Sequence, residues 1–257
     1  MAPALAIADT APAASSATLG GMVQARRQTA NISAPPPSWA SGNASRWAMH
    51  TSDPLDAIAT VATVDRDCPL FREGDHADNV FEVMSGTIRV FKLLPDGRRQ
   101  IIGFLEAGDF LGLSFNDTYL YTAEAVTTAA VRRFPRRRLE ALIDENPVVR
   151  RRLLAVTANE LLTAQEQMVL LGRKSAKEKL CTFLMTLSRK AAKRGLSDTR
   201  LSMPMGRSDI ADYLGLTIET VSRTITCLKT AGLIRLLEGH KIELADPDAI
   251  SELSDAA

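Results

Sequence analysis

Cysteine and histidine are scarce in this sequence, with three residues of each type among 257. Cys68, Cys181 and Cys227 are too few and too far apart for the disulfide framework of a secreted domain. Reduced thiols are typical of the cytoplasm. No stretch approaches the roughly 18 apolar residues of a membrane-spanning helix, and the N-terminus lacks the basic start and apolar core of a secretory signal. We therefore expect a cytoplasmic protein that does not insert into a membrane.

The sequence also lacks the combinations of residues that form catalytic or metal-binding sites. The sequence shows no paired carboxylates, no nucleophile with an adjacent base and no cluster of metal ligands. It therefore predicts no enzyme activity, no catalytic residue and no bound metal.

Charge is unevenly distributed, although the whole chain has a net charge of only +1. From Leu55 to Gly172 there are 14 basic and 17 acidic residues, a net of −3. From Arg173 to Lys241 there are 14 basic and 6 acidic residues, a net of +8. Such a concentrated positive field indicates that the second segment binds nucleic acid.

Composition and periodicity divide the chain into four segments. Residues 1–53 are rich in Ala, Ser and Pro, and we expect a disordered extension because they cannot bury enough apolar surface. Short alternating stretches between glycine turns predict an antiparallel β-roll over residues 54–145. A long helix is expected over residues 146–172, and a helical DNA-binding domain with a β-hairpin over residues 173–250. The predicted fold class is therefore α+β.

The stretch around Gly215 has the pattern of a helix-turn-helix. Gly215 can adopt the left-handed geometry that ends a first helix, and Leu216 is an apolar plug in the turn. Thr217 can cap a second helix. Apolar residues then recur at helical spacing and predict one buried face: Val221, Ile225 and Leu228.

The opposite face of this second helix carries side chains that can contact base edges. Arginine pairs with guanine O6 and N7, and a carboxylate accepts a hydrogen bond from cytosine N4. We expect four base-reading residues: Ile218, Glu219, Ser222 and Arg223.

The run Glu219-Thr220-Val221-Ser222-Arg223 resembles the Glu-x-x-Ser-Arg signature of the Fnr and FixK branch of the Crp/Fnr transcription regulators. The order of Gly-Asp and Ser-Gly turns resembles the β-roll sensor of the same family, so the resemblance covers about residues 65 to 245. It implies a homodimeric activator of microoxic, anaerobic or nitrogen-fixation genes. Its partners would be double-stranded DNA with TTGA-N6-TCAA-like palindromes and RNA polymerase.

The resemblance also implies positions that contact phosphate groups. The segment Glu238-Gly239-His240 is expected to form the turn of a winged hairpin whose tip lies against the DNA backbone. The expected phosphate contacts are Arg207, Ser208, Thr217, Thr220 and His240.

The long helix carries a narrow apolar stripe with a spacing of seven, as in a coiled coil. Leu154, Leu161 and Met168 are seven residues apart, and Ala158 and Gln165 lie between them in the same stripe. This stripe could pack against the roll of its own chain, but the matching helix of the family is the dimer coiled coil. We therefore predict a dimer seam.

The family's cofactors are not predicted for this chain. Gly112-Leu113-Ser114 and Tyr121-Thr122-Ala123 lack the glutamate and the arginine with which cyclic-AMP receptors hold their ligand. Three cysteines are too few for an iron–sulfur cluster, and His76 is the only histidine within the roll that could bind haem. We expect a FixK-like protein without a cofactor; the alternative is a regulator gated by a small molecule in the roll.

Cys227 lies one helical turn after Arg223, on the side that would face the groove. A small packing residue is one interpretation. A redox-sensitive thiol beside the DNA is the other, since an oxidised adduct would disturb a tight fit.

Overall fold

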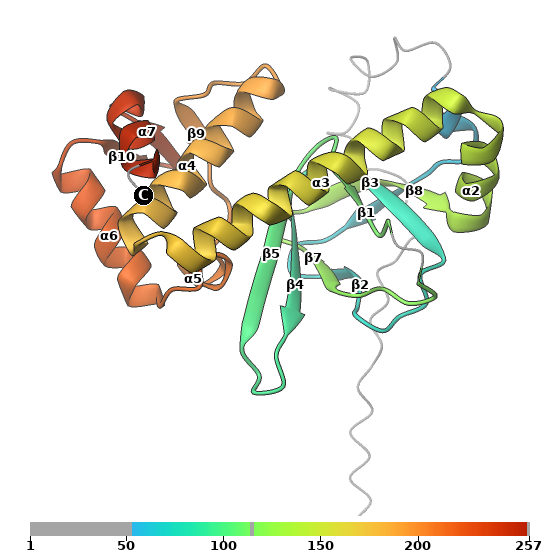
Figure 1. Cartoon of the computed structure of the whole chain (residues 1–257), viewed down its shortest axis with the longest axis horizontal. Helices are drawn as coiled ribbons and strands as arrows, with labels where there is room; N and C mark the ends of the chain where they lie inside the picture. Colours follow the sequence, from blue (N-terminus) through green and yellow to red (C-terminus); the bar gives the residue numbers. More distant parts are fainter. Residues whose placement is uncertain (1–52, 114–115, 256–257) are drawn as a thin grey trace, which may run out of the picture.

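The computed structural model describes residues 53–113 and 116–255, so nearly all of the predicted N-terminal extension lies outside the described residues. The first domain is a roll of two antiparallel sheets (Figure 1). One sheet has the order β1 (Thr60–Val64), β8 (Ala129–Pro135), β3 (Asn79–Ser85) and β6 (Phe110–Leu111). The other has the order β2 (Pro69–Phe71), β7 (Thr122–Ala125), β4 (Ile88–Leu93) and β5 (Arg99–Leu105).

Alternating side chains of the two sheets form the core of the roll. Val64, Val83 and Val131 of the first sheet are buried in one cluster with Ile88 and Ala125 of the second. Because successive residues of a strand point to opposite faces, the alternation of residues 87–93 made β4 predictable. Strand β1 was not expected from the sequence pattern, although it pairs along its whole length with β8.

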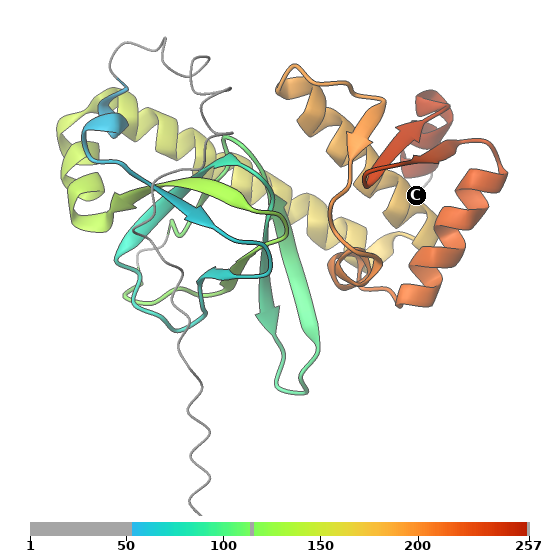
Figure 2. The same ribbon diagram turned by 180° about the vertical axis from the view of Figure 1, so that it is seen from behind.

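Two helices follow the roll, and the second connects the two domains. Helix α2 spans Arg136–Glu145 and helix α3 spans Pro147–Arg173. The Asn146 side chain caps α3 by accepting hydrogen bonds from the backbone N–H groups of Val148 and Val149. The first turns of α3 contact the roll, since Arg152 lies 3.0 Å from the buried carboxylate of Glu82. The helix then runs across the molecule to the second domain, as both views show (Figures 1 and 2).

The C-terminal domain is a winged helix-turn-helix. Its helices are α4 (Ala176–Lys193), α5 (Arg207–Leu214), α6 (Ile218–Thr230) and α7 (Pro247–Asp255). Strands β9 (Arg200–Ser202), β10 (Ile234–Leu237) and β11 (Lys241–Leu244) form its sheet in the order β10-β11-β9. Helix α7 packs against α4 and runs to Asp255, past residue 250, the predicted end of this domain.

The two domains share apolar contacts. Phe104 of the roll lies 6.2 Å from Phe183 and 5.5 Å from Tyr213 between ring centroids. Phe104 belongs to the same buried cluster as Phe91 and Ile101 of the roll and the core of the C-terminal domain. The second domain is therefore docked on the roll as well as tethered to it.

No helix in the part of the chain that the structure describes is long and apolar enough to cross a bilayer.

Gly86 and Gly97 provide a matched pair for testing how closely the roll is packed. Both have a backbone φ of +83°, which costs alanine about 1–2 kcal/mol. A Cβ atom on Gly86 would lie 2.5 Å from the Thr128 carbonyl oxygen. A Cβ atom on Gly97 would have no neighbouring atom of the described residues within 4 Å. Gly86→Ala should therefore lower the free energy of unfolding by about 1–3 kcal/mol more than Gly97→Ala, because it adds overpacking. Equal losses in urea denaturation would contradict this.

Candidate nucleic-acid interface

The turn between α5 and α6 has the geometry expected from its sequence. Gly215 adopts the left-handed conformation, with φ +60°, and its N–H donates to the Ala211 carbonyl. Leu216 packs against the buried core of the domain. The Thr217 hydroxyl then accepts a hydrogen bond from the Thr220 N–H, at 3.2 Å, and caps α6. These local interactions hold the two helices in a fixed relation.

Helix α6 has one buried and one exposed face. Val221, Ile225 and Leu228 are buried, as predicted. The four residues predicted to read bases are all exposed to solvent on the remaining surface: Ile218, Glu219, Ser222 and Arg223. The helix can therefore be inserted into a groove without being removed from its own core.

Glu219 is held in its ionised form. Hydrogen bonds from its own N–H and from the Thr217 hydroxyl lower the pKa of the Glu219 carboxyl, and the charge of Arg223 lowers it further. An ionised carboxylate is a pure acceptor, which suits the amino group of cytosine. Glu219 and Arg223 thus place an acceptor and a donor side by side on the exposed face.

Arg207 stands at the first position of α5 with no carboxylate partner among the residues described. Its Nη1 atom is buried without a hydrogen-bond partner there, and burial alone lowers the pKa of its guanidinium. This charge lacks the anion that would compensate its desolvation. Ser208 beside it is exposed.

The other predicted phosphate contacts lie on two elements. The hydroxyls of Thr217 and Thr220 are 3.1 Å apart at the start of α6. His240 is exposed in the turn between β10 and β11, at a positive φ of 56°. Its carbonyl accepts a hydrogen bond from the Met203 N–H, which ties the wing to the chain before α5.

The predicted seam of α3 is open to solvent. Leu154, Leu161 and Met168 are 67%, 61% and 71% exposed, and Ala158 and Gln165 are exposed beside them. The buried side chains of α3 are Val149, Leu153 and Leu170, and Val156 and Leu171 are partly buried against the same chain. The stripe therefore does not pack against the roll of its own chain, which was one of the two interpretations.

The interior of the roll is occupied by aromatic rings of the chain itself. Phe71 stacks on Tyr119 with centroids 3.7 Å apart and lies 5.6 Å from Tyr121. The Tyr121 hydroxyl accepts a hydrogen bond from the Gly112 N–H, and the Tyr119 hydroxyl donates to the Asn79 carbonyl. Ser114, which belongs to the stretch compared with cyclic-AMP receptors, is outside the described residues. Among the residues described, no three His, Cys, Asp or Glu side chains are grouped for a metal.

The Thr122 hydroxyl, in the stretch where cyclic-AMP receptors place a phosphate-binding run, accepts a hydrogen bond from the Glu73 N–H at 3.1 Å. No arginine lies at positions 121–123 to pair with a phosphate. The described residues of the roll therefore do not fit a cyclic nucleotide.

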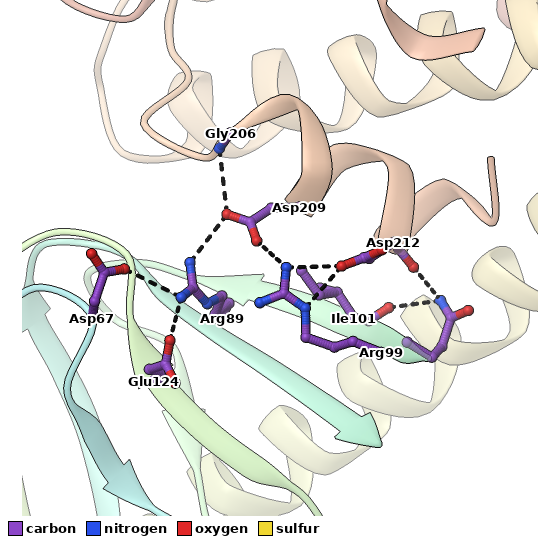
Figure 3. Close-up of polar contacts among 9 residues, drawn as sticks. Asp67, Arg89, Arg99, Ile101, Glu124, Gly206, Asp209 and Asp212 are labelled. Atoms are coloured by element: carbon purple, nitrogen blue, oxygen red, sulfur yellow. Dashed lines mark hydrogen bonds and ion pairs between the residues drawn. The ribbon is translucent and has the colours of Figure 1, made fainter. Parts of the chain in front are cut away.

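Sequence reasoning missed a set of ion pairs between the domains. Asp209 and Asp212 of α5 are bonded to Arg89 and Arg99 of the roll (Figure 3). The spacing of the two aspartates places both on one helical face, and this was the available signal. It did not indicate the partners, which lie more than a hundred residues away.

The cysteines differ in exposure. Cys227 is exposed on α6, Cys68 is half-buried and Cys181 is buried, where burial raises the pKa of its thiol.

Known proteins match both domains. Residues 62–146 match the cyclic nucleotide-binding domain family, and residues 178–253 match the Crp-like helix-turn-helix domain family. The nitrogen fixation regulation protein FixK of Bradyrhizobium diazoefficiens is 44% identical over 188 residues, 73% of this chain and 78% of that protein. The transcriptional activatory protein AadR of Rhodopseudomonas palustris is 43% identical over the same shares.

A solved structure extends the likeness to the whole architecture. FixK2 from Bradyrhizobium japonicum superposes with a TM-score of 0.73 at 38% identity, covering 78% of this chain and 99% of that one. The order of β-roll, long helix and helix-turn-helix is thus shared with it, in agreement with the predicted α+β class. The chain belongs to the Crp/Fnr family of DNA-binding transcription regulators.

Proposed function

We propose that this protein is a homodimeric, FixK-like transcription activator that binds TTGA-N6-TCAA-like palindromes without an effector. It acts in the cytoplasm, where it binds its DNA sites and contacts RNA polymerase. Relatives named as regulators of nitrogen fixation and as transcriptional activators support the activator role. The name of the first relative favours nitrogen-fixation genes as targets, and the resemblance to the Fnr and FixK branch adds microoxic or anaerobic genes. The observation that carries the proposal is the exposed face of α6, set on a fully buried opposite face.

Three residues of α6 can read one base pair and its neighbour. Arg223 donates to guanine O6 and N7, and Glu219 accepts from the amino group of the paired cytosine. Ser222 and Ile218 are exposed on the same helix. We assign Ser222 to a neighbouring thymine and Ile218 to an apolar contact at the start of the helix. The exposed carboxylate of Glu219, one turn before Arg223, supports its role as an acceptor.

The phosphate contacts place this face in the groove. Arg207 has a charge that no described carboxylate neutralises, so a DNA phosphate would supply the missing anion. Ser208, Thr217 and Thr220 have hydroxyls at the starts of α5 and α6, where helix N-termini favour anions. His240 adds a contact from the wing.

A second copy of the chain covers the exposed stripe of α3. Contiguous exposed apolar side chains on a helix indicate an interface, and the spacing of seven is that of a coiled coil. Leu162 and Val169 widen the stripe, since they are also exposed. Two chains joined along α3 present two recognition helices, which a palindrome requires.

The aromatic filling of the roll supports binding without an effector. Phe71, Tyr119 and Tyr121 provide their own packing and hydrogen bonds inside the roll. The roll then serves as a support for α3 and for the DNA-binding domain.

We also propose Cys227 as a redox-sensitive thiol. It is exposed and follows Arg223 by one turn, so it lies along the face that enters the groove. Attack of its thiolate on hydrogen peroxide gives a sulfenic acid and hydroxide, and further adducts add bulk.

The test of the proposed function is Arg223→Ala on a panel of duplexes at fixed salt. The parent protein should bind the TTGA palindrome with no added small molecule. The variant should lose about 1–3 kcal/mol at each half-site and no longer discriminate against TTAA, because the guanine contact is gone. Fluorescence anisotropy measures both quantities.

Arg207→Ala is the contrasting variant. It should weaken binding to all sequences alike and reduce the slope of log K against log salt by about 0.9 for each phosphate that is no longer neutralised. Equal affinity of the parent for TTGA and TTAA would refute the assignment of Arg223. A requirement for cyclic AMP or another small molecule would refute the effector-free function and favour a ligand-gated regulator.

Leu161→Asp should disrupt the dimer, because it places two charges at the centre of the seam. Sedimentation should show a monomer, and affinity for the palindrome should fall with it. Thr163→Asp is the matched control, since Thr163 is exposed two residues further along α3 and off the stripe. A Leu161→Asp protein that remains a dimer would show that the seam lies elsewhere.

Peroxide should weaken DNA binding of the parent, and thiol should restore it. Cys227→Ser should bind DNA and resist peroxide, because serine has nearly the same size without the oxidisable sulfur. Cys68→Ser should remain sensitive, as its thiol is half-buried in the roll. If Cys227→Ser loses binding as fast as the parent, Cys227 is only a packing residue.

A further inference from the structure

The linker between α3 and the DNA-binding domain is short. Helix α3 ends at Arg173, and α4 begins at Ala176 with Ser175 as its cap. Only Lys174 and Ser175 lie outside both helices. Rotation about the backbone bonds of these two residues would reorient the whole DNA-binding domain. The orientation of that domain therefore depends on its contacts with the roll.

The ion pairs at α5 are one of these contacts. Asp209 is 6% exposed, and its Oδ1 lies 2.5 Å from Nη2 of Arg99 while its Oδ2 lies 3.1 Å from Nη1 of Arg89 (Figure 3). Arg99 also lies 2.8 Å from Asp212. The Gln100 side chain donates to the Asp212 carbonyl oxygen at 2.8 Å. Strands β4 and β5 thus hold α5 at two successive turns.

Arg89 is itself fixed in place from the roll. It is paired with Glu124 of β7 and lies 3.2 Å from Asp67. Burial alone would lower the pKa of Arg89, but the hydrogen bond with Glu124 and the charges of Asp209, Glu124 and Asp67 together raise it. The guanidinium group of Arg89 therefore stays charged and is held in one orientation toward α5.

A second contact has the opposite polarity. Here the DNA-binding domain provides the cations: Lys190 lies 3.3 Å from Asp109 and Arg194 lies 2.5 Å from Glu106. Lys190 also donates to the Phe104 carbonyl oxygen at 3.0 Å. Rotating the domain so that the two contacts were exchanged would bring like charges together, which costs several kcal/mol at an interface. The charge pattern therefore specifies one orientation.

We infer that Asp209, Arg89 and Arg99 are positioning residues, whose ion pairs hold the helix-turn-helix in the orientation that sets the spacing of the two recognition helices. The role rests on the proposed function, because it explains how a dimer fits a palindrome with no ligand. Half-sites lie about one helical turn, roughly 34 Å, apart, so both helices need defined positions. The cap and the turn join α5 to α6, and fixing α5 therefore fixes α6.

The experiment compares Arg99→Gln with Arg98→Gln in the full chain. Both variants replace an arginine of the β4–β5 hairpin by the same amide. The ion pair of Arg98 stays within the hairpin, 2.7 Å from Asp96, whereas that of Arg99 crosses to α5. Arg99→Lys keeps the charge and tests for rescue.

The first readout is a distance in the DNA-free protein. Spin labels are placed at Cys227 of α6 and at Val61→Cys of β1, which is exposed, in a Cys68→Ser background diluted with unlabelled chains. We expect a narrow distance distribution in the parent and in Arg98→Gln, and a broad one in Arg99→Gln.

The second readout is affinity for palindromes whose spacer is one or two base pairs shorter or longer. Arg99→Gln should bind the correct spacing about tenfold more weakly, equivalent to about 1.4 kcal/mol, and should lose the preference among spacers. Arg99→Lys should recover most of both. A purely structural defect would weaken binding without changing the spacer preference.

An unchanged distance distribution and spacer preference in Arg99→Gln would overturn the inference. Tighter DNA binding by Arg99→Gln would also overturn it, since the ion pairs would then hold the domain away from its DNA-binding orientation. If Arg99→Gln melts early, Asp212→Asn removes one of the two carboxylates paired with Arg99 and replaces it by a nearly isosteric amide. A parent that needs a small molecule for DNA binding would refute the effector-free function, while the DNA-free distances would still decide the positioning role.

Discussion

Asp209 is a carboxylate buried between two domains, and its burial requires counter-charges at close range. Within its own domain it accepts one hydrogen bond, from the Gly206 N–H at 3.3 Å, which caps the start of α5. Its counter-charges, Arg89 and Arg99, come from the roll. An unpaired buried charge costs several kcal/mol. The same carboxylate therefore stabilises a helix start and links the helix-turn-helix to the sensor-like domain.

The recognition helix could be predicted because its determinants are local. Gly215 ends one helix, Thr217 starts the next, and Val221 and Ile225 follow at the spacing of a single face. Each interaction spans four residues or fewer. The sequence alone therefore identified α5, α6 and the exposed face of α6.

Other features depend on partners distant in the sequence, and these were not predicted. Strand β1 is recognisable as a strand mainly through its pairing with β8, some seventy residues later. Strand β9 has only three residues and is defined by β11. The pairing of Arg99 with Asp212 joins residues that no periodicity relates. Which charges meet across a domain boundary is a property of the three-dimensional arrangement.

Helix α5 carries acidic side chains that face the roll and a basic side chain, Arg207, at its first position. One helix thus contacts the roll and belongs to the DNA-binding unit. Asp209 and Asp212 contact the roll, whereas Arg207 has no carboxylate partner among the described residues. The side that meets arginines is thus neutralised within the chain, and the positive charge that remains is available to phosphate. Because Arg207 and Asp209 are only two residues apart, a shift of α5 on the roll would also displace the phosphate contact that we propose for Arg207. In the positioning role that we infer, the roll contributes to DNA recognition through the position of α5.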